Sequence, residues 1–192
     1  MRFVKNILAV IGVLALLAGG FGYAKYKAFF GSLDPEAPRV FAEMYDKFMP
    51  GRDWADAMMW EFPVAQGVSP EDVKRSLTSL AYGRNLLFTG EAPFYKQAEA
   101  TIGKPYRYVN FLSFCDARVG MMMLDYNNKY SGFMPCRIAI VQDNSGKVWI
   151  YSMNLDMMIY GGKPLPPELK AKAITVRNTL YEIMKAAAAG EF

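Results

Sequence analysis

The chain has 192 residues, 53% of them hydrophobic, and a formal net charge of +4. Four of its 22 basic residues flank the apolar N-terminal segment, and the other 18 balance the 18 acidic residues, all of which follow position 27. A neutral domain lacks the positive surface that phosphate backbones require, which argues against nucleic-acid binding. The chain contains no histidine, which excludes Ser-His and Cys-His catalytic pairs and the usual zinc sites.

The first segment predicts a membrane anchor over residues 1–27. No charged residue occurs between Lys5 and Lys25. The 18 residues from 7 to 24 would form a helix of roughly 27 Å, close to the hydrocarbon thickness of a bilayer. A cleaved export signal is the alternative, with small residues at Gly22 and Ala24 flanking a cut. The full apolar length, ending in aromatics and lysines, favours a retained anchor. Because the same segment also resembles an export signal, the domain is expected to face a periplasm-like space.

Residues 28–59 are expected to form a linker and a juxtamembrane helix. Val40, Met44 and Phe48 recur at helical spacing, and a Pro50-Gly51 pair follows them. Such a helix lies either on the bilayer surface or on the core of the domain that follows. The domain itself is placed at residues 60–192.

The domain opens with a strand and a helix. The strand is predicted at residues 58–67. A helix then begins at Ser69, because serine caps a helix and Pro70 fits its first turn. Glu71 and Asp72 favour the positive end of the helix dipole.

Two strands and a second helix follow. One strand is predicted over residues 85–95, with interruptions at Gly90 and Pro93. The next covers residues 104–115, where aromatic residues alternate as on a pleated surface. Asp116 is placed to cap the helix after it.

The C-terminal part predicts a hairpin and a long helix. Two β-rich runs within residues 133–153 flank a turn at residues 143–146. Apolar residues then recur every three or four positions over residues 169–183, as on one buried helix face. The predicted order is β-α-β-β-α-β-β-α, an α+β domain with an antiparallel sheet and helices on one face.

Three segments carry a family resemblance: FLSFCDARVGMMML, FMPCRIAIVQDNSGKVWI and MNLDMMIYGGKPLPPELKAKAI. Together they resemble the domain of unknown function 302 family over about residues 60–184. The resemblance implies a curved antiparallel sheet with two helices, like that of the TATA-binding protein, and often a dimer. It implies no established activity. The N-terminal segment makes the chain similar to a membrane-anchored bacterial subset of that family. This similarity implies an anchor in the bacterial inner membrane, with the domain facing the periplasm.

Cys115 and Cys136 are the candidate site residues. They stand where strand-like runs meet turn or helix signals, so they are interpreted as buried structural thiols, as a disulfide, or as a ligand or redox pair. Soft ions such as copper suit thiolate and thioether ligands, and Met121–Met123 and Met134 lie close in sequence. Arg137 is added as a possible cofactor-binding residue that reaches a ligand anion.

The function expected from these features is a non-enzymatic, single-span accessory subunit of a larger membrane complex. Ala15/Gly19 and Ala18/Gly22 have the small-residue spacing that lets helices pack closely in lipid. Expected partners are membrane lipid and either complex subunits or a second copy in a homodimer. The alternative is a ligand-binding or redox domain in which the cysteine pair holds a soft metal, a hydrophobic cofactor or a switchable disulfide. Cysteine-based catalysis is a third and weaker hypothesis.

Overall fold

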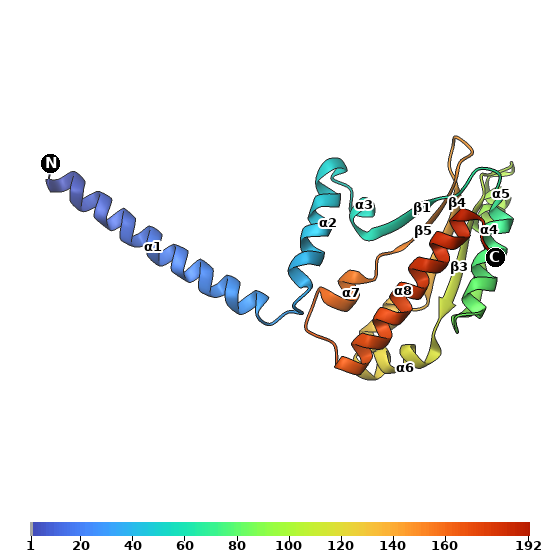
Figure 1. The fold of residues 1–192 in the computed structure, drawn as a ribbon. Coiled ribbons are helices and arrows are strands. Elements are labelled where there is room, and N and C mark those ends of the chain that lie inside the picture. Colours follow the sequence, from blue (N-terminus) through green and yellow to red (C-terminus); the bar gives the residue numbers. More distant parts are fainter. Residues whose placement is uncertain (1) are drawn as a thin grey trace.

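The first helix stands apart from the rest of the molecule. The structure, a computed structural model, describes residues 2–192. Helix α1 (Arg2–Phe30) extends away from the folded body as one continuous rod (Figure 1). Its Val4–Phe30 stretch is long and apolar enough to cross a membrane, and none of it is buried against the domain. One apolar helix of this kind is compatible with either a membrane anchor or a signal segment.

A short connection joins α1 to the domain. Helix α2 (Ala37–Gly51) and the short helix α3 (Trp54–Met58) follow it, so the helix predicted in this region is confirmed. Asp34 lies between α1 and α2 and is fully buried. Its backbone N–H donates to the Gly162 carbonyl at 2.8 Å, and its carboxylate accepts a hydrogen bond from the Lys170 ammonium. These two contacts of Asp34 therefore fix the connection to the domain shortly after α1 ends.

The core of the domain is one antiparallel sheet of five strands. Its strands lie in the order β1-β5-β4-β3-β2. The strands are β1 (Met59–Pro63), β2 (Leu87–Ala92), β3 (Val109–Cys115), β4 (Cys136–Gln142) and β5 (Val148–Met153). The predicted hairpin is β4-β5: the Asp143 carboxylate accepts hydrogen bonds from the N–H groups of Ser145 and Lys147, and Gly146 takes a φ of 87°. A bulge interrupts the β2-β3 pairing between Phe88 and Gly90.

Two helices cover one face of this sheet, α4 (Pro70–Tyr82) and α8 (Pro167–Ala189). A third helix, α6 (Ala117–Tyr126), contacts α8. The predicted caps are confirmed, because Ser69 and Asp72 form a reciprocal capping box and Asp116 accepts from two N–H groups of α6. Helix α8 lies beside α4 across the sheet (Figure 1). Fully buried side chains from strands and helices meet there, namely Leu77, Leu112, Phe114, Ile138, Ile140, Ile150, Leu180, Ile183 and Met184. The α+β class predicted from the sequence is therefore correct.

Two short helices are additions to the predicted order. Helix α5 (Phe94–Ile102) replaces the end of the strand expected up to residue 95, and α7 (Asp156–Tyr160) precedes α8; a 3-10 turn, η1 (Asn128–Phe133), follows α6. The strand prediction was wrong for Phe94 and Tyr95, whose β-propensity misled it. In the structure these rings pack on strand β3 and its approach, with Tyr95 stacked on Tyr108 at 4.9 Å between ring centroids.

The opposite face of the sheet carries no helix layer. Strand alternation decides which side chains lie there, since Leu112 and Phe114 are buried in the core and Phe111 and Ser113 point the other way. The same period places Arg137 and Ala139 of β4 beside Phe111 and Ser113. We call this uncovered side the open face.

Asp156 and Arg177 form the most enclosed ion pair that joins two helices of the domain. Arg177 donates two hydrogen bonds to the Asp156 carboxylate, at 2.9 and 3.0 Å, and lies over the Trp60 ring. We expect Asp156→Ala to lower the free energy of unfolding by about 3–5 kcal/mol, because it leaves the guanidinium unpaired in a mostly buried position. Denaturant unfolding in mild detergent measures this. The control Arg39→Ala removes exposed ion pairs and should cost less than about 1 kcal/mol; equal losses would contradict the prediction.

Candidate functional site

The two cysteines meet at one end of the sheet. Phe114 of β3 pairs directly with Cys136 of β4, so Cys115 stands one residue beyond that pair. Both thiols are free, and both line a small cavity of about 40 Å³. Three thioether side chains line the same cavity: Met123, Met134 and Met158. Five sulfur-containing side chains from four separate segments therefore line one small space, which we call the sulfur cavity.

Helix α6 shapes this cavity. The Asp116 carboxylate accepts hydrogen bonds from the N–H groups of Arg118 and Val119, at 3.0 and 3.1 Å, and so starts the helix directly after Cys115. One turn later Gly120 lies against the cavity. A Cβ atom at Gly120 would stand 3.4 Å from the Met134 sulfur and 3.6 Å from the Cys115 sulfur. The missing side chain leaves the space between the helix and these two sulfurs open.

Both thiols are held in the protonated form. Burial raises the pKa of Cys136 to about 11, and the neighbouring Cys115 contributes to the shift. Burial also raises the pKa of Cys115, with a smaller contribution from the negative charge of Asp116. Because the thiolate is the nucleophile, neither cysteine is activated for attack at neutral pH. Within residues 2–192 the structure contains no group of three or more His, Cys, Asp or Glu side chains arranged to hold a metal.

The structure separates the remaining predicted site residues. Met134 lines the sulfur cavity, as does Met123, whereas Met121 is exposed to solvent. Arg137 lies on the open face, where its guanidinium is 5.4 Å from the Phe111 ring centroid. Among residues 2–192 the structure shows no ion pair between Arg137 and Asp116. Met158 was missed, because it belongs to a helix that the sequence pattern did not predict.

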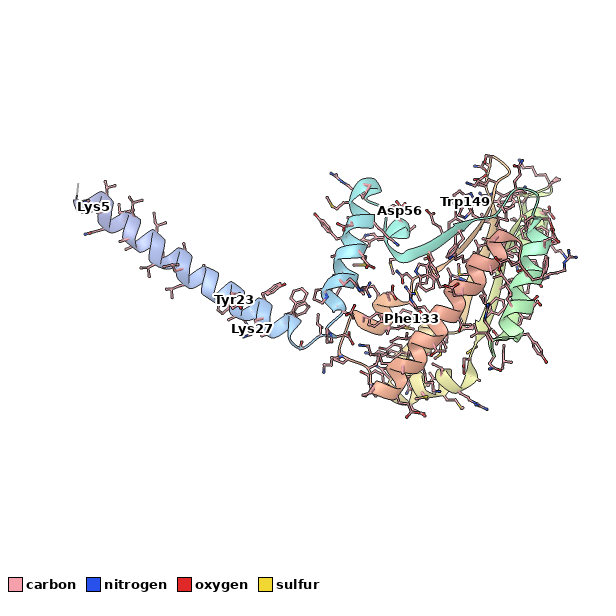
Figure 2. All side chains as sticks on the ribbon, viewed as in Figure 1. Lys5, Tyr23, Lys27, Asp56, Phe133 and Trp149 are labelled. Carbon is pink, nitrogen blue, oxygen red and sulfur yellow. The ribbon has the colours of Figure 1, made fainter. Side chains whose placement is uncertain are left out.

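The open face forms a second, much larger concavity of about 650 Å³. Its lining combines aromatic, thioether and cationic groups, including Phe111, Phe133, Arg137, Tyr151 and Met153. Cys136 borders both this groove and the sulfur cavity. Phe133, labelled in Figure 2, is 46% exposed and also borders both. The two concavities therefore meet at the start of β4.

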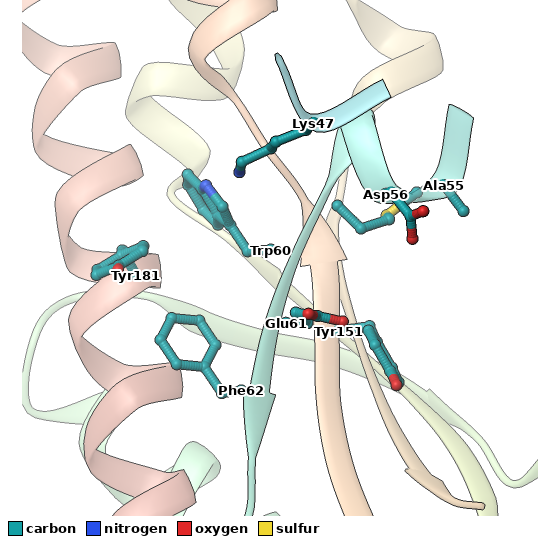
Figure 3. Close-up of a pocket in the computed structure, with 9 residues that line it drawn as sticks. Lys47, Ala55, Asp56, Trp60, Glu61, Phe62, Tyr151 and Tyr181 are labelled. Carbon is teal, nitrogen blue, oxygen red and sulfur yellow. The ribbon is translucent and has the colours of Figure 1, made fainter. Parts of the chain in front are cut away.

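A third concavity, of about 400 Å³, lies at the free edge of β1. Figure 3 shows Lys47, Asp56 and Glu61 around it, with Tyr181 approaching from α8. Lys47 comes from α2 and Asp56 from α3, both outside the sheet. Their exposed charges suit a solvated cleft better than a buried ligand site.

Comparison with known proteins identifies the domain but no activity. The model of the family described as "Domain of unknown function DUF302" matches residues 60–187. A solved structure titled "Crystal structure of uncharacterized conserved protein DUF302 from Bacillus stearothermophilus" superposes with a TM-score of 0.54. It is 16% identical, and the match covers 67% of this chain and 97% of that chain. The likeness shows the fold alone, and no curated protein matches the chain.

The raised thiol pKa values predict slow alkylation. We expect Cys136 to react with iodoacetamide on the order of 100-fold more slowly at pH 7.5 than an unperturbed thiol, because a pKa about two units higher leaves a hundredth of the thiolate. The rate should rise about tenfold per pH unit up to pH 10 without reaching a plateau. Mass spectrometry of alkylated peptides from the native protein measures it, with the urea-unfolded protein as control. A plateau below pH 9 would contradict the raised pKa.

Proposed function

The chain belongs to the DUF302 family, and we propose that it is a single-span membrane protein whose domain serves as a non-catalytic accessory subunit of a membrane complex. The observation that carries this proposal is helix α1, whose apolar membrane-length window has no buried residue. Exposing that much apolar surface to water is unfavourable, and a bilayer removes the cost. Export of the domain to the periplasm of a bacterium, across the inner membrane, is part of the proposal.

The junction after α1 supports a fixed placement near the bilayer. The buried Asp34 ties the connection to Gly162 and to Lys170 of α8. Beyond it, the Phe30 ring meets the Phe41 ring of α2 edge-on, with centroids 6.5 Å apart. The domain in this arrangement lies next to the membrane surface and is not held at the end of a flexible tether.

Helix α2 offers the bilayer a second contact. It contacts α7 of the domain on one side and α1 through Phe30 on the other (Figure 1). Val40 is buried, and Met49, nine residues later, lies half a turn out of phase with it and 42% exposed. Tyr45 and Trp54 are 58% and 57% exposed. Tyrosine and tryptophan favour the headgroup level of a bilayer, so we assign this outer side of α2 and α3 to the interface.

The open face supports a protein partner. The open face is left without a covering layer. It presents aromatic side chains and Arg137, and these residue types are enriched in protein interfaces. The anchor adds a membrane-embedded contact. A Cβ atom placed at Gly19 or Gly22 would have nothing within 4 Å, so a second helix can approach α1 closely at these small residues. A partner subunit that spans the membrane beside α1 and also has a periplasmic part would bind both the small residues of α1 and the open face.

Photo-crosslinking tests the partner. We expect a photoreactive amino acid at Ala139, on the open face, to crosslink the same membrane protein that co-purifies with the unmodified chain in mild detergent. The matched control is the same group at Lys185, exposed on α8 on the covered side of the sheet, which should not crosslink that protein. Isolation as a lone monomer, or crosslinks from Ala139 only to a second copy, would overturn the accessory-subunit role.

Lipid quenching tests the placement of α2 and α3. The chain has three tryptophans, Trp54, Trp60 and Trp149. In vesicles that contain brominated lipid, we expect Trp54 fluorescence to be quenched at least several-fold more than that of the other two, because Trp54 lies at the proposed interface and Trp60 is buried. Trp54→Phe should remove the quenching, and Trp149→Phe should leave it unchanged. Equal quenching in both variants would refute the interfacial placement while leaving the anchor itself intact.

A further inference from the structure

We propose that the sulfur cavity is a binding site for one soft monovalent cation, Cu(I), held by the sulfurs of Cys115 and Cys136 and the thioether of Met134. Each thiol releases its proton to solvent when the ion binds, and the resulting thiolate is the ligand. Met123 and Met158 complete the lining as neighbouring thioethers. This inference concerns the interior of the domain and is independent of the anchor and of the accessory-subunit role.

The donor set is selective for soft ions. Two thiols and three thioethers border the cavity, and its single carboxylate, Asp116, is occupied in capping α6. Thiolate and thioether sulfur suits Cu(I), whereas Mg²⁺ and Ca²⁺ require oxygen ligands. A structural zinc site uses four Cys or His ligands, and this chain has two cysteines and no histidine.

The size of the cavity fits a single ion. A volume of about 40 Å³ exceeds the roughly 10–15 Å³ that one water molecule needs. It is far below the roughly 300–1,000 Å³ of pockets for organic ligands. The hydrophobic-cofactor version of the ligand-binding alternative therefore does not suit this space. The lining contains no lysine or arginine, so no basic side chain competes with a bound cation.

Gly120 is the most specific indication. Glycine inside a helix costs about 1 kcal/mol relative to alanine, so a mid-helix glycine calls for a local reason. Beyond its own helix backbone and its chain neighbours, the only heavy atoms within 4 Å of a Cβ at this position are the sulfurs of Met134 and Cys115. A methyl group there would be in ordinary van der Waals contact with both, which the fold tolerates. What it would remove is free space next to the two sulfurs.

An entry path exists on the open-face side. Cys115 is partly exposed, and Cys136 borders the large groove of the open face as well as the cavity. Phe133 lines both spaces and is itself nearly half exposed. We place the route of the ion here, past the exposed Phe133 side chain.

Competition with a chromophoric Cu(I) chelator tests the site. The full chain is purified in mild detergent, reduced, freed of metal and titrated with Cu(I) without oxygen. We expect one Cu(I) bound per chain, displaced by Ag(I) and unaffected by Zn(II). No uptake of Cu(I) by the reduced protein would overturn the proposal, as would a chain that takes up Zn(II) equally well.

Four variants separate binding from folding. Cys136→Ser should abolish stoichiometric uptake, and Met134→Leu should weaken affinity by about 10–100-fold, the scale of a disturbed metal site. Gly120→Ala should weaken affinity similarly while its melting temperature stays equal or rises, since alanine favours the helix. Met44→Leu, a half-buried methionine outside the cavity, should bind as the unmodified chain does. Unchanged affinity in Gly120→Ala and Met134→Leu would show that copper binds elsewhere, and would overturn the assignment.

Discussion

Helices cover only one of the two faces of this sheet, and the rest of the structure follows from that constraint. The buried alternate residues of β3, β4 and β5 pack against α4 and α8, which together make a single covering layer. Because successive side chains of a strand point to opposite faces, the intervening residues of these strands point to the open face. Cys136 and Arg137 illustrate the effect, because adjacent positions in β4 belong to opposite sides of the sheet. The sulfur cavity and the open-face groove are distinct for this reason, although one cysteine borders both.

Local signals predicted the fold well wherever the stabilising contact lies within a few residues. The caps at Ser69 and Asp116 and the turn after Asp143 are hydrogen bonds between near neighbours, so composition and spacing were enough to predict them. Helices α5 and α7 were not predicted, because distant contacts stabilise them. Tyr95 of α5 stacks on Tyr108, and Asp156 of α7 is held by Arg177 of α8. The apolar periodicity of a segment of five to nine residues does not indicate which distant residues it will contact.

The candidate site was predicted in part for the same reason. That both cysteines stand at strand ends was visible in the sequence, and pairing of β3 with β4 brings them to one cavity. Met158 could not be anticipated, since it arrives on α7 from more than 20 residues further along the chain. Arg137 could have been separated from Cys136 by the two-residue period alone. The significance of Gly120 needed coordinates, because a glycine in a helix indicates free space without saying what borders it.

Both edges of the sheet are interrupted: β2 has a bulge near Gly90, and β1 ends at Pro63, which has no N–H to donate. In dilute solution such interruptions matter little. Molecules that share a membrane, however, diffuse in two dimensions with their edges at the same height, so any unbroken edge would meet its own copy in a favourable orientation again and again. An anchored domain is thus under stronger pressure than a freely diffusing one to prevent strand-to-strand polymerisation.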